Sequence, residues 1–570
     1  MKRLLPYMKG YWKECILGPV FKLLEAIFEL IVPLVTARMI DVGIANRDMG
    51  YIWRMGGLMI VLAACGLLFA LICQYFASKC AYGFGTALRS ALYRHVNTLS
   101  HSALDRIGTA SLITRITSDT NTVQSGLNMM IRLATRCPFL IIGAAIMAMR
   151  IDLKLSVIFL IAIPIIGVLL YGVTCWTIPR YGENQGKLDN IARHTRENLD
   201  GVRVIRAFSR QEEEIASYRE DCDVFAKRSI AVGRVGAILN PASFLIMNLG
   251  IVAVLWFGGV RVDTGHLTQG ELTAFVNYMT QIALSMVRMA ELLISFNKAA
   301  ASAKRVSDIL AEEPDIVGGD AALDFRQDQP VLEFDHVTFA YPGGGEAALS
   351  DISFSLLPGE TLGIIGGTGS GKSTIANLIP RFYDTKEGSV RICGKDVRSY
   401  ALEELRQFVG VVPQRASLVT GTIADNLRWG NPDADTAELE QACKIAQAWE
   451  FVSQTPQGLE TPVTQGGRSL SGGQKQRLTI ARAMVGAPKL LILDDSMSAL
   501  DYATDLALRR ALAEKMQDVT KIVISQRATS IQHADHILVM EDGKCVGYGT
   551  HEELLVQCPV YAEIFQTQMQ

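Results

Sequence analysis

The sequence predicts an α-helical domain with six membrane spans and long cytoplasmic helices, followed by an α/β domain built on a phosphate-binding loop (P-loop). Long apolar runs, three of them without any charge, occur only before about residue 300. The remaining chain has the pattern of a soluble α/β protein, and one strand-like segment leads into a glycine-rich sequence at 366–374. These observations predict a transmembrane domain at 1–304, a polar linker at 305–330 and the α/β domain at 331–570.

The composition agrees with a membrane part joined to a soluble part. Of the 570 residues, 49% are hydrophobic and 20% are charged, and the mean hydropathy is +0.23. That hydropathy is too high for an ordinary soluble protein, and the length indicates more than one domain. The net charge of −2 does not favour nucleic acid as a partner. The 11 cysteines are scattered without CxxC pairs, which indicates free thiols in a reducing compartment rather than disulfides or a zinc site.

Six apolar segments are candidates for membrane spans, because a spanning helix needs about 20 mostly apolar residues. The first and last are interrupted by charges. The first follows a basic N-terminus without a small-residue cleavage site, so we expect an uncleaved membrane helix rather than a signal peptide. The predicted spans lie at 16–37, 55–78, 130–149, 155–178, 238–260 and 272–294.

The lengths of the connections predict the orientation of these spans. Spans three and four, and spans five and six, are joined by short loops, whereas the other two inner connections have about 50–60 residues with a charged, helical pattern. Long polar helices of this kind must share one side. Basic residues before the first span put that side in the cytoplasm, together with the C-terminal domain: Lys2, Arg3, Lys9 and Lys13. We therefore expect a multi-pass protein of the cytoplasmic membrane, with the lipid bilayer as a partner.

The strongest motif is a P-loop of the form G-x-x-x-x-G-K-S. Its glycines allow backbone N–H groups to surround phosphates, its lysine reaches the β- and γ-phosphates of ATP, and its serine hydroxyl can ligate Mg²⁺. A chance glycine-rich turn is disfavoured, because an apolar strand at 361–365 precedes the motif and a helical pattern at 374–382 follows it. The predicted phosphate-binding residues are Gly366, Gly367, Thr368, Gly369, Ser370, Gly371, Lys372, Ser373 and Thr374.

A second nucleotide element is the apolar strand at 489–495, which ends in two carboxylates. Asp494 is expected to hold Mg²⁺ through water, as the aspartate of a Walker B strand does. An apolar strand ending in aspartate is weak evidence alone, but it becomes strong evidence in a chain that also carries a P-loop.

Between these elements stands Leu-Ser-Gly-Gly-Gln-Lys-Gln-Arg at 470–477, and together they resemble the ATP-binding cassette (ABC) family over about residues 331–570. The resemblance implies that Tyr341 stacks on adenine, that Gln414 is the Q-loop glutamine near Mg²⁺, and that 498–501 is the D-loop. It also implies a set of nucleotide contacts from the signature motif, made by Ser471, Gly472, Gly473 and Gln474.

The membrane half resembles the exporter-type ABC domain at 88–123 and 197–208, where that family carries cytoplasmic loops with coupling helices that dock on the cassettes. The match is looser here, since Ala103 and Leu104 replace the usual Phe-Phe before Asp105. Six spans and one cassette make half of such a transporter. The resemblance therefore implies a second ABC half-transporter chain, with two ATP molecules sandwiched between the P-loop of one chain and the signature motif of the other.

Two departures from the family pattern affect catalysis. Asp495 stands where the family has glutamate, its general base, and Gln526 stands where it has the switch histidine that contacts the γ-phosphate. A third and weaker departure is Gln465, where a glutamate is common. Each change alone is compatible with neutral drift, but together they predict a degenerate site. The chain then resembles the degenerate-site chain of bacterial heterodimeric multidrug ABC exporters, whose partner chain keeps the glutamate and the histidine.

Charged residues inside the first and last spans are candidates for substrate contact, because intramembrane charges are costly and face a partner or a wet cavity. Glu25, Glu29, Arg288 and Glu291 then predict a cavity for amphipathic cations. The alternative is local pairing at i, i+3 spacing, of Lys22 with Glu25 and of Arg288 with Glu291. Glu29 has no local partner in the sequence and is the main candidate.

The function predicted first is ATP-driven export of small hydrophobic or amphipathic compounds, of the multidrug type. A lipid or peptide exporter is an alternative within transport. An ATP-gated channel or a regulatory subunit that hydrolyses little ATP is an alternative from another class, and an importer built on the exporter fold is a further one.

Overall fold

The computed structural model describes residues 2–342 and 344–569. It divides into two compact units. The first holds the chain up to Asn97 together with Ala110–Glu312, and the second holds Thr98–Thr109 together with the chain from Glu313 onward. A short segment between membrane helices therefore groups with the α/β unit.

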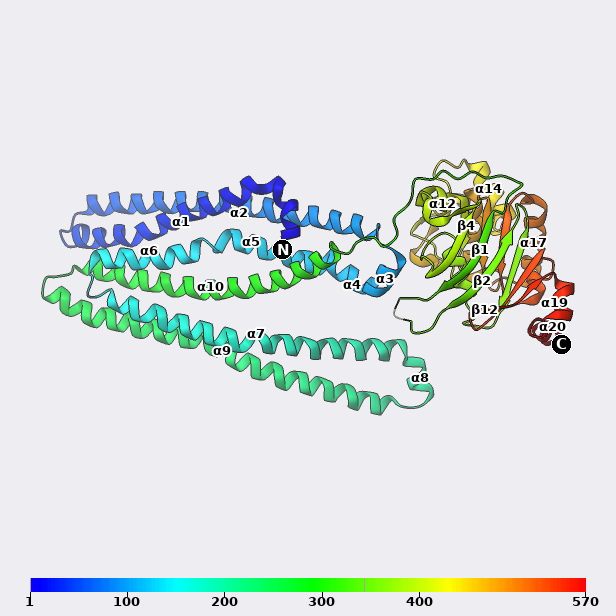
Figure 1. The fold of residues 1–570 in the computed structure, drawn as a ribbon. Coiled ribbons are helices and arrows are strands. Elements are labelled where there is room, and N and C mark those ends of the chain that lie inside the picture. The colour runs from blue at the N-terminus through cyan, green and yellow to red at the C-terminus, as the bar shows by residue number, and fades with distance from the viewer. Residues whose placement is uncertain (1, 343, 570) are drawn as a thin grey trace. The chain divides into compact units, whose positions relative to one another are not determined.

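The first unit is entirely helical (Figure 1). Five of its helical segments are long and apolar enough to cross a membrane: α2, the run Thr109–Ile151, α7, α9 and α10. The helix α1 is the remaining predicted span and carries the three charges of the first span. The elements are η1 (Lys2–Tyr11), α1 (Trp12–Arg38), η2 (Met39–Ile44), α2 (Met49–Val96), α4 (Thr109–Thr114), η3 (Arg115–Asp119), α5 (Thr120–Leu133), α6 (Arg136–Ile151), α7 (Val157–Asp200), α8 (Val202–Ala207), α9 (Gln211–Asp263) and α10 (Gln269–Ile309).

The helical run Thr109–Ile151 contains the predicted third span at 130–149. Within this run α5 ends at Leu133 and α6 begins at Arg136, close to Pro138, which has no N–H to bond the carbonyl of Ala134. The predicted linker began at 305, but α10 continues to Ile309 and ends in a helical turn at Leu310.

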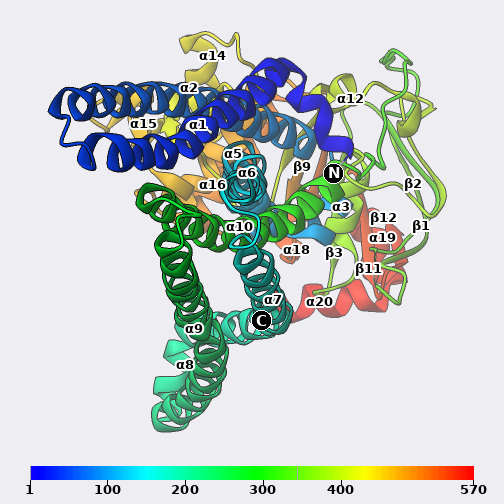
Figure 2. The same cartoon turned by 90° about the vertical axis from the view of Figure 1, so that its left-hand side faces the viewer.

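The helices of the first unit pack closely around α10. In both views α1 lies beside α2 (Figures 1 and 2), and α10 contacts α1, α5, α6 and α9, while α7 pairs with α9. Small side chains such as Ala26 and Ala144 lie in this core, where they allow close approach of the helices. The buried Tyr278 hydroxyl of α10 donates to the Leu30 carbonyl of α1 at 2.8 Å, which joins the two helices inside the apolar region.

The second unit contains two larger sheets and the two-stranded antiparallel pair β7–β8. One has six strands in the order β12-β11-β3-β10-β9-β6, parallel except for the β11–β12 pair, and the other is antiparallel in the order β2-β1-β4-β5. The strands are β1 (Leu332–Phe339), β2 (Leu349–Leu356), β3 (Thr361–Gly366), β4 (Glu387–Ile392), β5 (Lys395–Asp396), β6 (Val409–Val412), β7 (Gly421–Thr422), β8 (Pro462–Val463), β9 (Leu490–Asp494), β10 (Thr520–Ile524), β11 (His536–Glu541) and β12 (Lys544–Gly549).

The second unit also contains helices. They are α3 (His101–Ile107), α11 (Lys372–Leu378), α12 (Leu402–Phe408), α13 (Ile423–Leu427), α14 (Thr436–Ile445), α15 (Trp449–Ser453), α16 (Gly472–Val485), α17 (Tyr502–Lys515), α18 (Ala528–Ile531), α19 (His551–Gln557) and α20 (Pro559–Met569).

Both faces of the six-stranded sheet are buried. Along β9, Leu490 and Ile492 lie in one apolar cluster, whereas Leu491 and Leu493 lie in the other, as the period of two in a strand requires. A strand that is buried on both faces reads as a continuous apolar run, which is the pattern the sequence shows. Because β3, β10 and β9 are parallel neighbours, their carboxyl ends meet at one edge of the sheet.

Candidate functional site

The P-loop joins the carboxyl end of β3 to α11, and its backbone requires glycine. Gly371 has a φ of +96°, and a Cβ there would lie 2.7 Å from the carbonyl oxygen of Ala348. A Cβ on Gly366 would lie 2.1 Å from the carbonyl oxygen of Met540. The glycines of the motif are therefore needed for the shape of the loop, independently of any ligand.

Lys372 is held over this loop by carbonyl oxygens. Its Nζ donates to the carbonyls of Gly366 at 2.9 Å and Gly367 at 2.6 Å, and the residue is only 8% exposed. Burial lowers the pKa of the Lys372 ammonium, and the nearby Asp495 and Asp494 carboxylates oppose that change. The cation is thus fixed beside the loop N–H groups, where phosphates bind in P-loops.

The predicted Mg²⁺ ligands of the P-loop and of β9 lie together. Ser373 Oγ donates to Asp494 Oδ1 at 3.0 Å, and Asp494 is 9% exposed. Burial is the main cause that raises the pKa of the Asp494 carboxyl. Hydroxyl and carboxylate oxygens suit Mg²⁺, which takes its remaining ligands from water and nucleotide phosphates rather than from an acidic cage. Consistent with this, the described residues hold no group of three or more His, Cys, Asp or Glu side chains that suits a metal ion.

Asp495 follows β9 in a left-handed backbone conformation with a φ of +44°. Its N–H donates to the carbonyl of Ile524 at 2.9 Å, which ties it to the end of β10. Its Oδ2 accepts from Nε2 of Gln414 at 3.3 Å. The structure therefore brings the predicted Q-loop glutamine to Asp495, beside the Mg²⁺ ligands.

Gln526 lies two residues after the end of β10 and its side chain is exposed. The signature motif lies at the start of α16, where Ser471 caps the helix: Gln474 N–H donates to Ser471 Oγ at 3.3 Å, and Ser471 N–H donates to Gln474 Oε1 at 2.9 Å. Among the described residues no hydrogen bond or ion pair joins this motif to the P-loop of the same chain. A helix N-terminus with glycines at its first two positions favours an anion.

Tyr341 lies beside α11, the helix that follows the P-loop. Its hydroxyl lies 3.2 Å from Thr374 Oγ1, and its ring meets those of Phe339 and Tyr383 edge-on at 4.9 and 5.2 Å between centroids. Its predicted contact with adenine stays a prediction, as do the assigned roles of the other site residues.

The sequence analysis missed Tyr383, which connects this aromatic cluster to α3. Tyr383 Oη donates to Asp105 Oδ2 at 2.8 Å, and the His101 ring lies 4.5 Å from the Phe382 ring. Burial and the bond to Asp105 raise the pKa of the Tyr383 hydroxyl. The short helix α3 belongs to the predicted first cytoplasmic loop. Tyr383 therefore contacts both this loop, through Asp105, and the ring of Tyr341.

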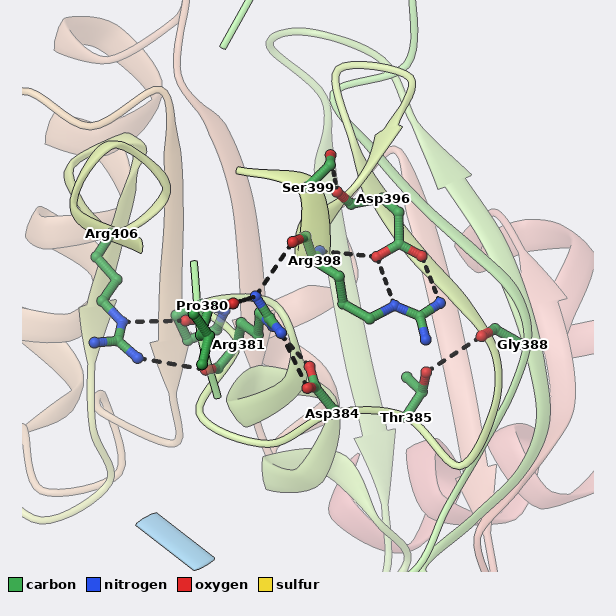
Figure 3. Close-up of polar contacts among 10 residues, drawn as sticks. Pro380, Arg381, Asp384, Thr385, Gly388, Asp396, Arg398, Ser399 and Arg406 are labelled. Atoms are coloured by element: carbon green, nitrogen blue, oxygen red, sulfur yellow. Dashed lines mark hydrogen bonds and ion pairs between the residues drawn. The ribbon is translucent and has the colours of Figure 1, made fainter. Parts of the chain in front are cut away.

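The turn that carries Phe382 and Tyr383 is fixed by arginines (Figure 3). Arg381 Nε donates to Asp384 Oδ1 at 2.7 Å, and Arg406 donates to the carbonyls of Pro380 and Arg381 at 3.4 Å each. Arg381 is 5% exposed, and its guanidinium also donates to the Val317 carbonyl at 2.9 Å. These bonds hold the turn in one shape, which sets the position of the Tyr383 hydroxyl.

In the first unit, two of the candidate substrate residues, Glu25 and Glu29, form ion pairs. Lys22 Nζ lies 2.6 Å from Glu25 Oε2, as the local-pairing alternative expected. Glu29 has no local partner, but it pairs at long range, since Arg136 Nη2 of α6 lies 2.7 Å from its Oε2. Its predicted contact with the substrate stays a prediction. Arg288 and Glu291 are both exposed and form no ion pair with each other in the described chain.

The chain matches two protein-family models. Residues 15–286 match the model described as ABC transporter transmembrane region, and residues 349–498 match the model described as ABC transporter.

The chain is also similar to bacterial proteins over most of its length. The chain is 36% identical over 567 residues to an ABC transporter ATP-binding protein of Mycobacterium tuberculosis, covering 99% of this chain and 97% of that protein. It is 33% identical over 477 residues to a fatty acid ABC transporter ATP-binding/permease protein of Mycobacterium bovis, covering 84% and 75% of the two chains. In fold it is similar to the ATP-bound structure of a bacterial Atm1-family ABC exporter, with a TM-score of 0.83, 24% identity and 99% of each chain covered.

The Asp494→Asn variant tests the Mg²⁺ role. Removing the carboxylate charge is expected to weaken binding of a fluorescent ATP analogue about tenfold in the presence of Mg²⁺. With the metal chelated, the affinity of the variant is expected to remain within about twofold of the parent chain, because the P-loop contacts are intact. An equal loss under both conditions contradicts this role.

The Tyr383→Phe variant tests the link between α3 and the aromatic cluster. It keeps the ring but removes the bond to Asp105, which is worth about 1 kcal/mol. Faster hydrogen exchange of the α3 amides is expected, with ATP affinity unchanged. The matched control is Tyr548→Phe, which loses a hydroxyl bond to the Ser355 carbonyl elsewhere in the unit. If α3 exchanges at the same rate in both variants and the parent chain, the link has no role in holding α3.

Proposed function

The chain belongs to the ABC transporter family, with a transmembrane domain and an ATP-hydrolysing cassette that uses ATP with Mg²⁺, and on that premise we propose that it is one half of a heterodimeric exporter whose own nucleotide site is slow. The observation that carries this proposal is the pair Asp495 and Gln526, which occupies both catalytic positions of one site. We propose that the protein lies in the cytoplasmic membrane, with its N-terminus and cassette in the cytoplasm, because basic residues precede the first span.

Asp495 is poorly suited to act as a general base. Its carboxylate ends one C–C bond, about 1.5 Å, short of the glutamate that the family uses. A base must lie within hydrogen-bonding distance of the attacking water, so a shift of this size removes much of the rate. In addition, the Gln414 amide already donates to its Oδ2. ATP binding does not depend on this group, because the P-loop and Ser373 make the phosphate and Mg²⁺ contacts.

Gln526 removes a second catalytic contribution. An amide can donate a hydrogen bond to the γ-phosphate, but it cannot carry the positive charge of an imidazolium. Transition-state stabilisation of a phosphoryl group depends on positive charge near its oxygens. Two losses in one site favour degeneracy over neutral drift.

The signature motif keeps the family pattern and a complete capping box at Ser471. Its orientation at the start of α16 supports a role for Ser471, Gly472 and Gly473 in completing the site on a partner's P-loop. The proposed partner is therefore a second ABC half-transporter that keeps the glutamate and the histidine. Substrate-dependent ATPase activity of the reconstituted pair distinguishes a pump from a regulatory subunit that only senses nucleotide.

The proposed cargo is a small hydrophobic or amphipathic compound. The similarity to a protein named as a fatty acid transporter supports the lipid alternative within that class. The ion pairs of Glu25 with Lys22 and Glu29 with Arg136 reduce the acidic character of the first span, which weakens the case for a cavity selective for cations.

The isolated chain is expected to hydrolyse ATP very slowly, and Asp495→Glu is expected to raise turnover of the heterodimer, because it restores the reach of the base. Phosphate release by the purified proteins measures both. The matched control is Asp495→Asn, which cannot act as a base and should not raise turnover. Robust hydrolysis by the isolated parent chain contradicts the slow-site proposal.

The Glu29–Arg136 pair separates a structural role from a cargo contact. Glu29→Gln leaves a 10% exposed arginine side chain without its partner, so thermal stability should fall. Breaking an exposed pair costs about 0–1 kcal/mol of unfolding free energy, and breaking a buried pair costs about 3–5 kcal/mol. The expected fall in the unfolding free energy lies between these values, because the Glu29 side chain is 36% exposed. The double variant Glu29→Gln, Arg136→Gln should recover stability.

Export assays on the parent chain, the Glu29→Gln variant and the double variant then show whether Glu29 has a structural role or contacts the cargo. If export of a cationic dye returns together with stability in the double variant, Glu29 has a structural role only. If stability returns but export stays low, the carboxylate contacts the cargo.

A further inference from the structure

The side chain of Gln568, near the end of α20, bridges two backbone groups on either side of Arg527. Its Nε2 donates to the carbonyl of Gln526 at 2.7 Å, and its Oε1 accepts from the N–H of Ala528 at 2.7 Å. We propose that Gln568 is a positioning residue of the nucleotide site, which holds the segment Gln526–Ala528 in the conformation that presents Gln526 to the γ-phosphate.

The bridge has the geometry of one rung of a β-ladder. Arg527 is extended, with φ −95° and ψ 115°, so the carbonyl of the residue before it and the N–H of the residue after it face the same side. A primary amide carries one donor edge and one acceptor edge at a similar spacing. Gln568 therefore pairs with the segment as a neighbouring strand would, and it stabilises the extended form against others.

The segment needs this support because its own helix is weak. The helix α18 has four residues, and its N-cap residue Arg527 makes no capping bond with its side chain. The first N–H groups of a helix have no intrahelical partner, and a single turn does not offset the cost of nucleation. Gln568 Oε1 supplies the missing acceptor for Ala528, from a different element of the unit.

The helix α20, which carries Gln568, is held against the rest of the unit by buried aromatic residues. Tyr561 is fully buried in the same apolar cluster as Ala528 and Ile531, and its hydroxyl lies 2.7 Å from His551 Nδ1. Phe565 packs against that cluster and lies 4.9 Å from the His551 ring between centroids. Gln568 follows Tyr561 by seven residues, two helical turns, so it lies on the same face of α20 as the buried anchor.

The other side of the segment is fixed by the sheet. Ser525 N–H donates to the Ile364 carbonyl of β3 at 3.1 Å, and Arg527 N–H donates to Ser525 Oγ at 3.0 Å. The peptide of Gln526 is therefore held between β3 and α20. These two supports hold the backbone at Gln526, while the residue itself is exposed.

This inference rests on the proposed position of Gln526 near the γ-phosphate, so the test includes that residue. The full-length chain is purified with Gln568→Ala, Gln568→Glu, Gln526→Ala or Gln566→Ala. Gln566 is an exposed glutamine of the same helix, for which the described structure shows no hydrogen bond, and it serves as the matched control. Binding of MgATP and MgADP is measured for each protein, together with hydrogen exchange of the Ala528 amide.

For Gln568→Ala, which loses both bonds, we expect faster exchange at Ala528 and an about fivefold fall in the preference for MgATP over MgADP, the factor that corresponds to about 1 kcal/mol. Gln568→Glu keeps the acceptor for Ala528 but loses the donor to the Gln526 carbonyl. It should therefore protect the amide partly and show an intermediate preference. Gln566→Ala should match the parent chain in both measurements.

The outcomes separate the two proposals. If Gln526→Ala lowers the preference for MgATP but Gln568→Ala does not, the positioning role of Gln568 is overturned and the role of Gln526 stands. If neither variant changes the preference, both roles are overturned. A fall in the affinity for both nucleotides alike in Gln568→Ala indicates general loosening of the unit and also overturns the positioning role.

Discussion

The parallel pairing of β3, β10 and β9 is the constraint on which the nucleotide unit depends. Parallel neighbours end at the same edge, so the P-loop, the two aspartates at the end of β9 and the segment after β10 are brought together by the sheet itself. The strands can take this central place because both of their faces are apolar. The bond from Asp495 N–H to the Ile524 carbonyl then joins two of the three loops directly. Changes at one catalytic position are therefore felt at the next.

A different constraint shapes the helical unit. Inside a membrane, charges are costly and apolar burial does not drive helices together, so close packing and polar pairs hold the helices. The Tyr278 hydroxyl on the Leu30 carbonyl and the Arg136–Glu29 pair both join α1 to a neighbouring helix. Charges that resemble a binding site in the sequence thus have a structural partner in the fold.

The two-part architecture was predictable because both of its signals are local. Uncharged apolar runs predict membrane spans, and the P-loop motif predicts a strand, a turn and a helix within about a dozen residues. What the sequence did not show were contacts between residues far apart in the chain. Glu29 and Arg136 are 107 positions apart, and Tyr383 and Asp105 are 278 apart, so no periodicity connects them. Gln568 carries no motif, and only its two bonds mark it.

The helix α10 is a continuous helix of 41 residues without an internal proline. At 1.5 Å per residue it is a rod about 60 Å long. Such a rod acts as a lever, since a tilt of about 5° at one end moves the other end by about 5 Å, roughly the rise of one helical turn. The capped start of α10 at Thr268 and its bonds to α1 and η3 determine the point about which the helix tilts. A small change of tilt near the middle of the helix bundle thereby becomes a displacement of several ångströms at the end of α10.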